Sequence, residues 1–259
     1  MAQSHVSDRP ARSLRAQRAT ALLAFLAYWV GWELMARAGF FYEGAVPSSV
    51  AILGALYHIV FERALYANFA VTAFEVLAAV AIGGGGGLAF GLLGGTVRII
   101  REAYEPYVHY LAPTPKIIFL PILFLLFGVG IATKIALGAL SAFFPMAIAT
   151  FAGVRTVSPV LLRVGRSFNL TPLQMAHKIY LPALRAPVIT GLKLAFGFAL
   201  TGVMLAEIKL SNVGLGFMAI QYYDHFQIAQ LYALLMIIFM IAAGTNALLD
   251  RLMPRDQIG

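Results

Sequence analysis

The side chains that could perform chemistry in this chain are few and form no recognisable catalytic or metal-binding set. No HExxH or paired-carboxylate pattern occurs, and the histidines have no metal-ligand spacing. They are His5, His58, His109, His177 and His225. The chain has no cysteine, which excludes disulfides and thiol chemistry. It has no Walker sequence either, so any ATP and Mg must be bound by another chain. The sequence predicts a protein that is not itself an enzyme and holds no metal or cofactor.

A polar, basic and turn-rich stretch, residues 158–182, lies between two long apolar runs. Ser158-Pro159 and Thr171-Pro172 each have the pattern of a helix N-cap followed by proline at the first helical position, so they predict two short helices. Asn169 lies between them and tolerates the left-handed backbone of a sharp turn. The second helix is expected to end at Leu181-Pro182, because proline cannot continue a helical turn.

The second of these helices, over residues 173–180, is predicted to have two apolar faces separated by a polar strip. One face comprises Leu173, Ala176 and Tyr180, the other Met175 and Ile179, and the strip Gln174 and Lys178. Apolar surface on two sides favours two contacts, one with the membrane-embedded body and one with a soluble partner. The alternative is a helix that lies on the bilayer surface, held there by aromatic and basic residues.

The composition is that of a polytopic membrane protein, with 61% hydrophobic residues, 12% charged residues and a mean hydropathy of +0.83. Apolar runs of about 20 residues, the length that spans a bilayer, lie near 19–37, 68–97, 106–127, 134–154, 188–207 and 228–248. The predicted fold is therefore all-α, with a six-helix transmembrane domain over 19–250 that includes the polar loop at 155–187. Short tails flank it at 1–18 and 251–259. Residues 40–67 are too polar to span and are expected to contain one short external helix.

The basic residues gather on one side of the predicted membrane domain, as they do in cytoplasmic loops. With the N-terminus inside, that side holds Arg9, Arg12, Arg15, Arg18, Arg98, Arg101, Arg155, Arg163, Arg166, Lys178, Arg185, Arg251 and Arg255. The other side holds only Arg37, Arg63, Lys134 and Lys209. Both termini are therefore predicted to be cytoplasmic. A cleaved signal peptide is the alternative for the first run, which is long for one and lacks a clear small-residue cleavage site. This bias and anionic lipid account for the net charge of +8 without a nucleic-acid partner.

The second apolar run carries glycines at four-residue spacing, which places them on one helix face. They are Gly83, Gly87, Gly91 and Gly95. A face of small residues lets helices approach closely in lipid. A phosphate-binding loop is the alternative, but no Lys-Ser/Thr follows the glycines. The pattern favours helix packing.

The third apolar run begins with Pro113-Thr114-Pro115-Lys116 and meets a further proline at Pro121. Proline leaves backbone carbonyls without a partner, and in a membrane these are tolerated only where they are buried in protein or face a water-filled path. We expect Pro115, Lys116 and Pro121 to line a translocation path. The fifth run is rich in small residues, and we expect it to line the same path together with Phe196.

Glu207 and Lys209 lie at the end of the fifth run, shortly before Gly214-Leu215-Gly216. One interpretation is a Glu–Lys pair whose charged groups reach the membrane interface. The other is a gate that closes the external end of the path. The residues alone leave both open.

The polar loop resembles the EAA loop of permease subunits from bacterial ATP-binding cassette importers. In that pattern Glu-Ala-Ala is followed by Gly, Ile and Leu-Pro at fixed spacing, and Arg163-Val164-Gly165, Asn169, Ile179 and Leu181-Pro182 occupy these positions. Asn169 preserves the turn, whereas Arg163 stands where the family has an acidic residue. The resemblance implies contacts with an ATPase from Arg163, Val164, Gly165, Asn169, Leu170, Thr171, Pro172, Leu173, Met175, His177, Lys178, Ile179, Leu181 and Pro182.

Landmarks along the rest of the chain are similar to those of nitrate, sulfonate and taurine importer permeases. They are Pro47-Ser48, Pro115-Lys116, Leu120-Pro121, Phe127-Gly128, Ala206-Glu207 and Gly214-Leu215-Gly216-Phe217. The resemblance implies a second permease, in a homodimer or a paralogous heterodimer, and two cytoplasmic ATPase subunits that bind ATP and Mg. It also implies a periplasmic or lipid-anchored solute-binding protein, with the assembly in the bacterial inner membrane.

The sequence is therefore interpreted as a permease subunit of an ATP-binding cassette importer. Its solute would be nitrate-, sulfonate- or taurine-like, or an aromatic or pyrimidine compound. A secondary transporter and a membrane enzyme or assembly protein are the alternatives. A secondary transporter is expected to carry ionisable residues inside the membrane and often has inverted halves. This chain keeps its helix centres nearly free of charge and has no detectable halves, and a reactive constellation is missing.

Overall fold

The computed structural model describes residues 11–38 and 44–253, which form helices and connecting turns without any strand. This confirms the all-α prediction. By length and composition, five of these helices could cross a membrane, or six if one bent pair counts as a single span. Of the predicted tails, residues 1–10 and 254–259 lie outside the described part, and α1 (Ala11–Arg37) begins within the first tail.

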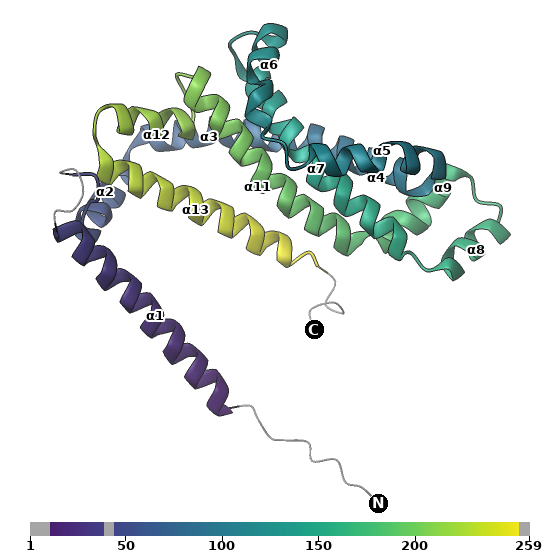
Figure 1. Ribbon diagram of the computed structural model, residues 1–259, viewed down its shortest axis with the longest axis horizontal. Helices are drawn as coiled ribbons and strands as arrows, with labels where there is room; N and C mark the ends of the chain where they lie inside the picture. Colours follow the sequence, from purple (N-terminus) through teal and green to yellow (C-terminus); the bar gives the residue numbers. More distant parts are fainter. Residues whose placement is uncertain (1–10, 39–43, 254–259) are drawn as a thin grey trace, which may run out of the picture.

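The first helix extends away from the bundle and meets it only near its C-terminal end (Figure 1). Its apolar part, Ala19–Arg37, is not buried against the rest of the chain. Trp29 makes one of the contacts there, since its indole N–H donates to Ser49 Oγ. The short helix expected before the second span is present as α2 (Ser49–Phe61), whose N-cap is Ser48.

The second span is a long helix of three parts, α3 (Arg63–Ala79), the π-helical turn η1 (Val80–Gly84) and α4 (Gly85–Thr96). Its glycine face lies directly on α7 (Ile131–Thr156). A Cβ atom on any glycine of this face would clash with α7, so only glycine permits this approach. The glycines concerned are Gly83, Gly87, Gly91 and Gly95. The packing interpretation is confirmed.

The third span is broken. α5 (Arg98–Leu111) is followed by a turn, the 3₁₀ helix η2 (Lys116–Phe119) and α6 (Leu120–Phe127), and the two halves are bent by 99°. The apolar run predicted near 106–127 is therefore not one straight helix, and its first helix begins earlier, at Arg98. Pro113 and Pro115 lack the N–H groups that would continue α5, so the helix ends before them. The apolar helix α6 then points away from the bundle (Figure 1).

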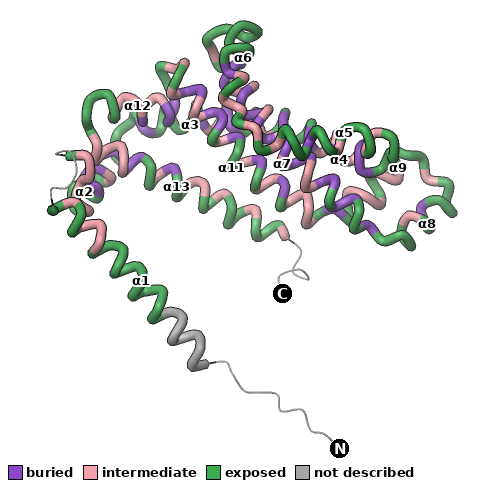
Figure 2. Tube along the Cα trace, in the orientation of Figure 1, coloured by how far each residue is buried: buried purple, intermediate pink, exposed green. Residues whose placement is uncertain are grey.

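The centre of the fold is an antiparallel hairpin of α7 and α11 (Arg185–Leu210), against which α3 and α4 pack. Small and β-branched side chains fill its core and allow close helix contact. They include Ala139, Ala142, Ala195, Ala199 and Val203. Burial is concentrated along this hairpin (Figure 2). We call the end at which the polar loop joins α7 to α11 the loop end, and the opposite end, with Ile131 and Leu210, the far end.

Two more helices complete the far end and its flank. α12 (Leu215–Asp224) follows α11, and α13 (Ile228–Asp250) runs back beside it. They share a hydrophobic core with α2, in which Ile59, Leu215 and Leu234 are buried. The bundle therefore places α2 and α12 together at the far end and the polar loop at the other.

Candidate functional site

The loop end has the two short helices that the N-cap patterns predict. Ser158 caps α8 (Pro159–Ser167) by accepting from the backbone N–H of Val160. Thr171 caps α9 (Pro172–Met175) in a reciprocal capping box, in which Gln174 Oε1 accepts from Thr171 N and Thr171 Oγ1 accepts from Gln174 N. The turn between the helices is left-handed at Asn169, with φ of 51°, as predicted.

The second loop helix does not end at Leu181-Pro182, so that prediction was wrong. α9 continues through the π-helical turn η3 (Ala176–Tyr180) into α10 (Leu181–Ala183). The wider π turn bonds the N–H of Leu181 to the carbonyl of Ala176 and places Pro182 at the start of the next helical turn. A proline at that position loses no helical hydrogen bond.

The two apolar faces of this helix have different surroundings. Met175 and Ile179 pack against the buried Gly165 of α8, inside the loop itself. Leu173, by contrast, is 80% exposed. It lies beside a cavity of about 420 Å³ between the loop and the end of α4. Ala176 and Tyr180 line the same cavity.

The other predicted coupling residues are spread over the loop surface. Those that are exposed are Arg163, Val164, Asn169, Thr171, Pro172, Leu173, His177, Lys178 and Pro182. Those that are partly buried are Leu170, Met175, Ile179 and Leu181. The loop therefore presents a basic surface with several exposed apolar side chains, of which Leu173 and Phe168 are the most exposed.

The broken span is held by Lys116. Its ammonium donates to three backbone carbonyls at the end of α5, those of Leu111, Ala112 and Thr114, at 2.8, 2.7 and 2.7 Å. It also lies 4.7 Å from the centroid of the Phe144 ring, near the middle of α7. A cation at a helix C-terminus neutralises the partial charge of its free carbonyls. These contacts indicate that Lys116 stabilises the bend between the two halves of the third span.

The two prolines and Phe196 have distinct positions. Pro115 immediately precedes η2, and Pro121 lies in the first turn of α6, where its missing N–H costs nothing. Phe196 is partly buried against the core of α3, α7 and α11. It also lines a cavity of about 290 Å³ that Phe69 and Ile241 border. The structure therefore does not gather these predicted path residues in one place.

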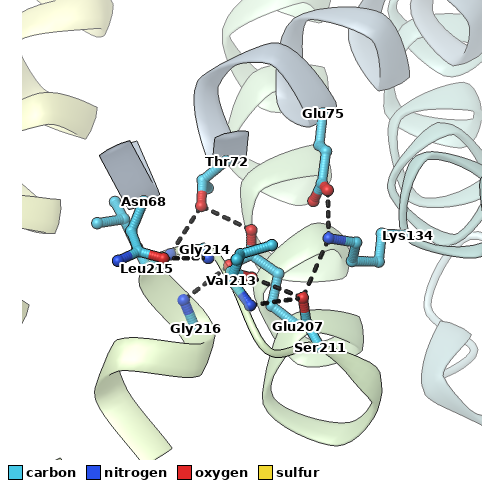
Figure 3. Close-up of polar contacts among 10 residues, drawn as sticks. All are labelled: Asn68, Thr72, Glu75, Lys134, Glu207, Ser211, Val213, Gly214, Leu215 and Gly216. Carbon is cyan, nitrogen blue, oxygen red and sulfur yellow. Dashed lines mark hydrogen bonds and ion pairs between the residues drawn. The ribbon is translucent and has the colours of Figure 1, made fainter. Parts of the chain in front are cut away.

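A buried polar cluster joins four elements at the far end (Figure 3). Glu207 of α11 is fully buried and accepts from Thr72 Oγ1 at 2.6 Å and from the N–H of Gly216 at 2.7 Å. Thr72 in turn accepts from the N–H of Leu215 at 2.8 Å, and Asn68 Oδ1 accepts from the N–H of Gly214. One carboxylate and two polar side chains thus satisfy the first backbone N–H groups of α12.

The expected pair between Glu207 and Lys209 is not formed, and that interpretation was wrong. Lys209 is exposed and makes no ion pair with any described residue, because it lies two positions along α11 from Glu207 and faces a different direction. The buried ion pair at this end joins Glu75 of α3 to Lys134 of α7. Lys134 also donates to Ser211 Oγ at 3.2 Å.

The sequence interpretation missed Glu75, Thr72 and Asn68, and it was wrong to treat the helix centres as nearly free of charge. A signal for them existed. Asn68, Thr72 and Glu75 follow one another at spacings of four and three residues, which places them on one helix face in an otherwise apolar run. Polar residues on one face inside a membrane helix indicate a buried partner.

Comparison with known proteins decides the family. A family model described as "Binding-protein-dependent transport system inner membrane component" matches residues 87–255, which include the broken span, the polar loop and Glu207. The chain belongs to this family. It is a permease subunit of an ATP-binding cassette importer, a multi-pass protein of the bacterial inner membrane. Permeases of this kind work with an ATPase and a solute-binding protein.

Individual relatives agree with the family. The permease is 27% identical over 227 residues to the putative aliphatic sulfonates transport permease protein SsuC of Bacillus subtilis, covering 88% of this chain and 82% of that protein. It is 29% identical over 224 residues to a probable ABC transporter permease protein of Haemophilus influenzae, covering 86% and 91%. It is 30% identical over 173 residues to the taurine transport system permease protein TauC of Escherichia coli, covering 65% and 62%.

Proposed function

We propose that this permease forms, with a second permease, the membrane path of an importer for a small sulfonate. The relatives named for aliphatic sulfonates and for taurine support the substrate class. The observation that carries the coupling part of the proposal is the capped two-helix loop, which holds the exposed apolar side chains of Phe168 and Leu173 on a basic surface. ATP is hydrolysed by a separate ATPase that docks on this loop.

Fewer residues of the second loop helix are available for docking than its two predicted apolar faces contain. Met175 and Ile179 pack against Gly165 within the loop, which leaves Leu173, beside the neighbouring cavity, as the exposed residue of the two predicted apolar faces. Burying a leucine side chain contributes about 1.5–3 kcal/mol. In protein interfaces a few such side chains account for most of the binding energy. The loop would lie in the cytoplasm, in keeping with the gathering of basic residues on that side.

Two exposed apolar elements support a second permease. The apolar part of α1 is not buried against this chain, and α6 extends from the bundle with Ile122, Leu125 and Leu126 exposed. Lipid covers such surfaces in a monomer, and a second permease can cover them in an assembly. We place the translocation path near the broken span, at this proposed interface. The far end would then face the solute-binding protein.

The proposal is tested with the complete importer in proteoliposomes that contain ATP and the solute-binding protein. Uptake of radiolabelled taurine or an alkanesulfonate should require ATP, and unlabelled nitrate or a pyrimidine should not compete. Uptake of nitrate or a pyrimidine with no uptake of sulfonate would refute the substrate class and leave the permease assignment unchanged.

Coupling is tested separately with Leu173→Asp. The variant should release the ATPase from purified complexes and weaken its binding at least about 30-fold, the equivalent of about 2 kcal/mol. Leu252→Asp is a matched control, because Leu252 is also exposed, at 63%, and lies after α13, outside the loop. If both variants keep the ATPase at native stoichiometry, Leu173 is not part of the docking face.

A further inference from the structure

Three ionisable side chains are buried together at the far end, and their charges do not balance when all three are ionised. Glu75, Lys134 and Glu207 are 0%, 5% and 0% exposed and come from α3, α7 and α11 (Figure 3). Two carboxylates and one ammonium leave a net charge of −1. An uncompensated charge in a desolvated site is strongly unfavourable. The cluster therefore requires one more positive charge.

The carboxyl oxygens of Glu75 indicate where that charge belongs. Apart from Lys134, no donor among the described residues satisfies them. Glu75 lies three residues after Thr72 on α3, and Thr72 donates to Glu207, so the carboxyl groups of Glu75 and Glu207 enter the same buried cluster from α3 and α11 (Figure 3). Glu207 already accepts one hydrogen bond on each oxygen, from Thr72 and from Gly216, and a carboxylate oxygen has room for a second.

A proton fits this position better than a metal ion does. Among the described residues no group of three or more His, Asp or Glu side chains could hold a metal, and Lys134 already provides the one cation of the cluster. Two adjacent carboxylates in a desolvated site cannot both remain ionised, and they commonly retain one proton between them. Such a carboxylic acid O–H also supplies the donor that the Glu75 oxygens lack.

No other ionisable group among the residues that the structure describes balances the charge. From α12, only the backbone N–H groups of Leu215 and Gly216 enter the cluster, and from α3 the neutral side chain of Thr72 does so. The connection after α11 provides the neutral hydroxyl of Ser211, which Lys134 contacts. Lys209, the nearest further cation on α11, is exposed.

We propose that Glu75 and Glu207 share a single proton, which makes the buried cluster neutral and holds α3 to α11 at the far end. The protonated pair carries −1 and Lys134 carries +1. When α3 and α11 separate and water enters, both carboxyl groups ionise and the proton is released. The joined state therefore binds one proton more than the separated state, so acid favours it and alkali favours separation. The equilibrium constant between the joined and separated states changes by about tenfold per pH unit. This holds over the pH range in which the pair is protonated in the joined state and ionised in the separated state.

Infrared spectroscopy of the purified permease at pH 7 tests this directly, independently of transport. The permease, labelled with ¹³C at its glutamate carboxyl groups, should have one carboxylic-acid C=O band from a buried glutamic acid. Glu75→Gln and Glu207→Gln should each abolish the band, because Lys134 balances the single carboxylate that remains. Glu62→Gln is the control, since the side chain of Glu62 is exposed, and the band should persist in it.

Two results would overturn the proposal. A wild-type spectrum without a carboxylic-acid band would mean that both carboxyl groups are ionised. A band that survives in either Glu75→Gln or Glu207→Gln would mean that one carboxyl group holds the proton by itself. Because the wild-type spectrum tests the first point without any substitution, the proposal remains falsifiable even if the variants do not fold.

Discussion

Replacement of Lys116 by methionine should destabilise the permease, because Lys116 satisfies the carbonyls at the broken end of α5. Its ammonium donates to Leu111, Ala112 and Thr114. A hydrogen bond from a charged donor contributes about 1.5–3 kcal/mol. The three bonds come from one ammonium group, so their contributions to stability are not additive. Lys116 is also only partly buried, so water can replace some of these bonds. We therefore expect a loss of about 2–4 kcal/mol in the free energy of unfolding.

Thermal unfolding of the purified permease measures this loss. At about 2–4 °C per kcal/mol for a chain of this size, Lys116→Met should lower Tm by roughly 5–15 °C. Lys116→Arg should recover part of the difference, because guanidinium also donates to carbonyls. Lys209→Met is the matched control, since Lys209 is exposed, and should change stability by less than about 0.5 kcal/mol. If the Tm of Lys116→Met equals that of Lys209→Met, the contacts of Lys116 do not hold the break.

Three further predictions use the same purified protein. Gly87→Leu should destabilise it by about 3 kcal/mol or more in the unfolding assay, because Gly87 lies against α7, whereas Gly85→Leu, with open space around it, should have little effect. Thr171→Ala should remove the capping box and speed amide exchange in α9 by about fivefold, for a cap of about 1 kcal/mol; unchanged exchange would contradict this. Leu125→Cys, 84% exposed on α6, should cross-link to a second permease more than Val50→Cys, 73% exposed on α2, and equal yields would place α6 outside the interface.

The two ends of the molecule are joined by the same hairpin. α7 and α11 pack against each other along most of their length, with alanine and valine in the core. α4 lies against α7 through its glycine face. Closely packed helices of this kind move as units rather than bending. A displacement of the loop by an ATPase would therefore reach the far-end cluster through the hairpin. A change in proton binding is expected at that cluster.

Local signals predicted the loop well because its structure is determined locally. Ser158 and Thr171 bond to backbone groups two and three residues away, and Asn169 adopts the left-handed turn by its own conformational preference. The glycine face of α4 was equally predictable, because the four-residue spacing is itself the helix period. In both cases the physical cause lies within one or two turns of the residue.

Predictions about helix ends failed where a proline can be accommodated in more than one way. At Pro182 a π turn widens the preceding helix and the chain continues, whereas at Pro113 and Pro115 the helix ends and the chain bends. The two sites differ locally, because two prolines and the carbonyl contacts of Lys116 combine at the bend, whereas Pro182 has neither beside it. One tertiary contact stabilises the bend further, since Lys116 also lies over the ring of Phe144 in α7.

The far-end cluster depends on contacts across the whole chain. Thr72 and Glu207 are 135 positions apart, and Glu75 and Lys134 belong to different spans. Periodicity can place Thr72 and Glu75 on one buried face, but it cannot choose their partners among the few ionisable residues of the other helices. Charge balance narrows that choice once the cluster is known, because two carboxylates buried with one ammonium need a further positive charge. The proton shared by Glu75 and Glu207 is therefore a consequence of tertiary structure that neither helix indicates alone.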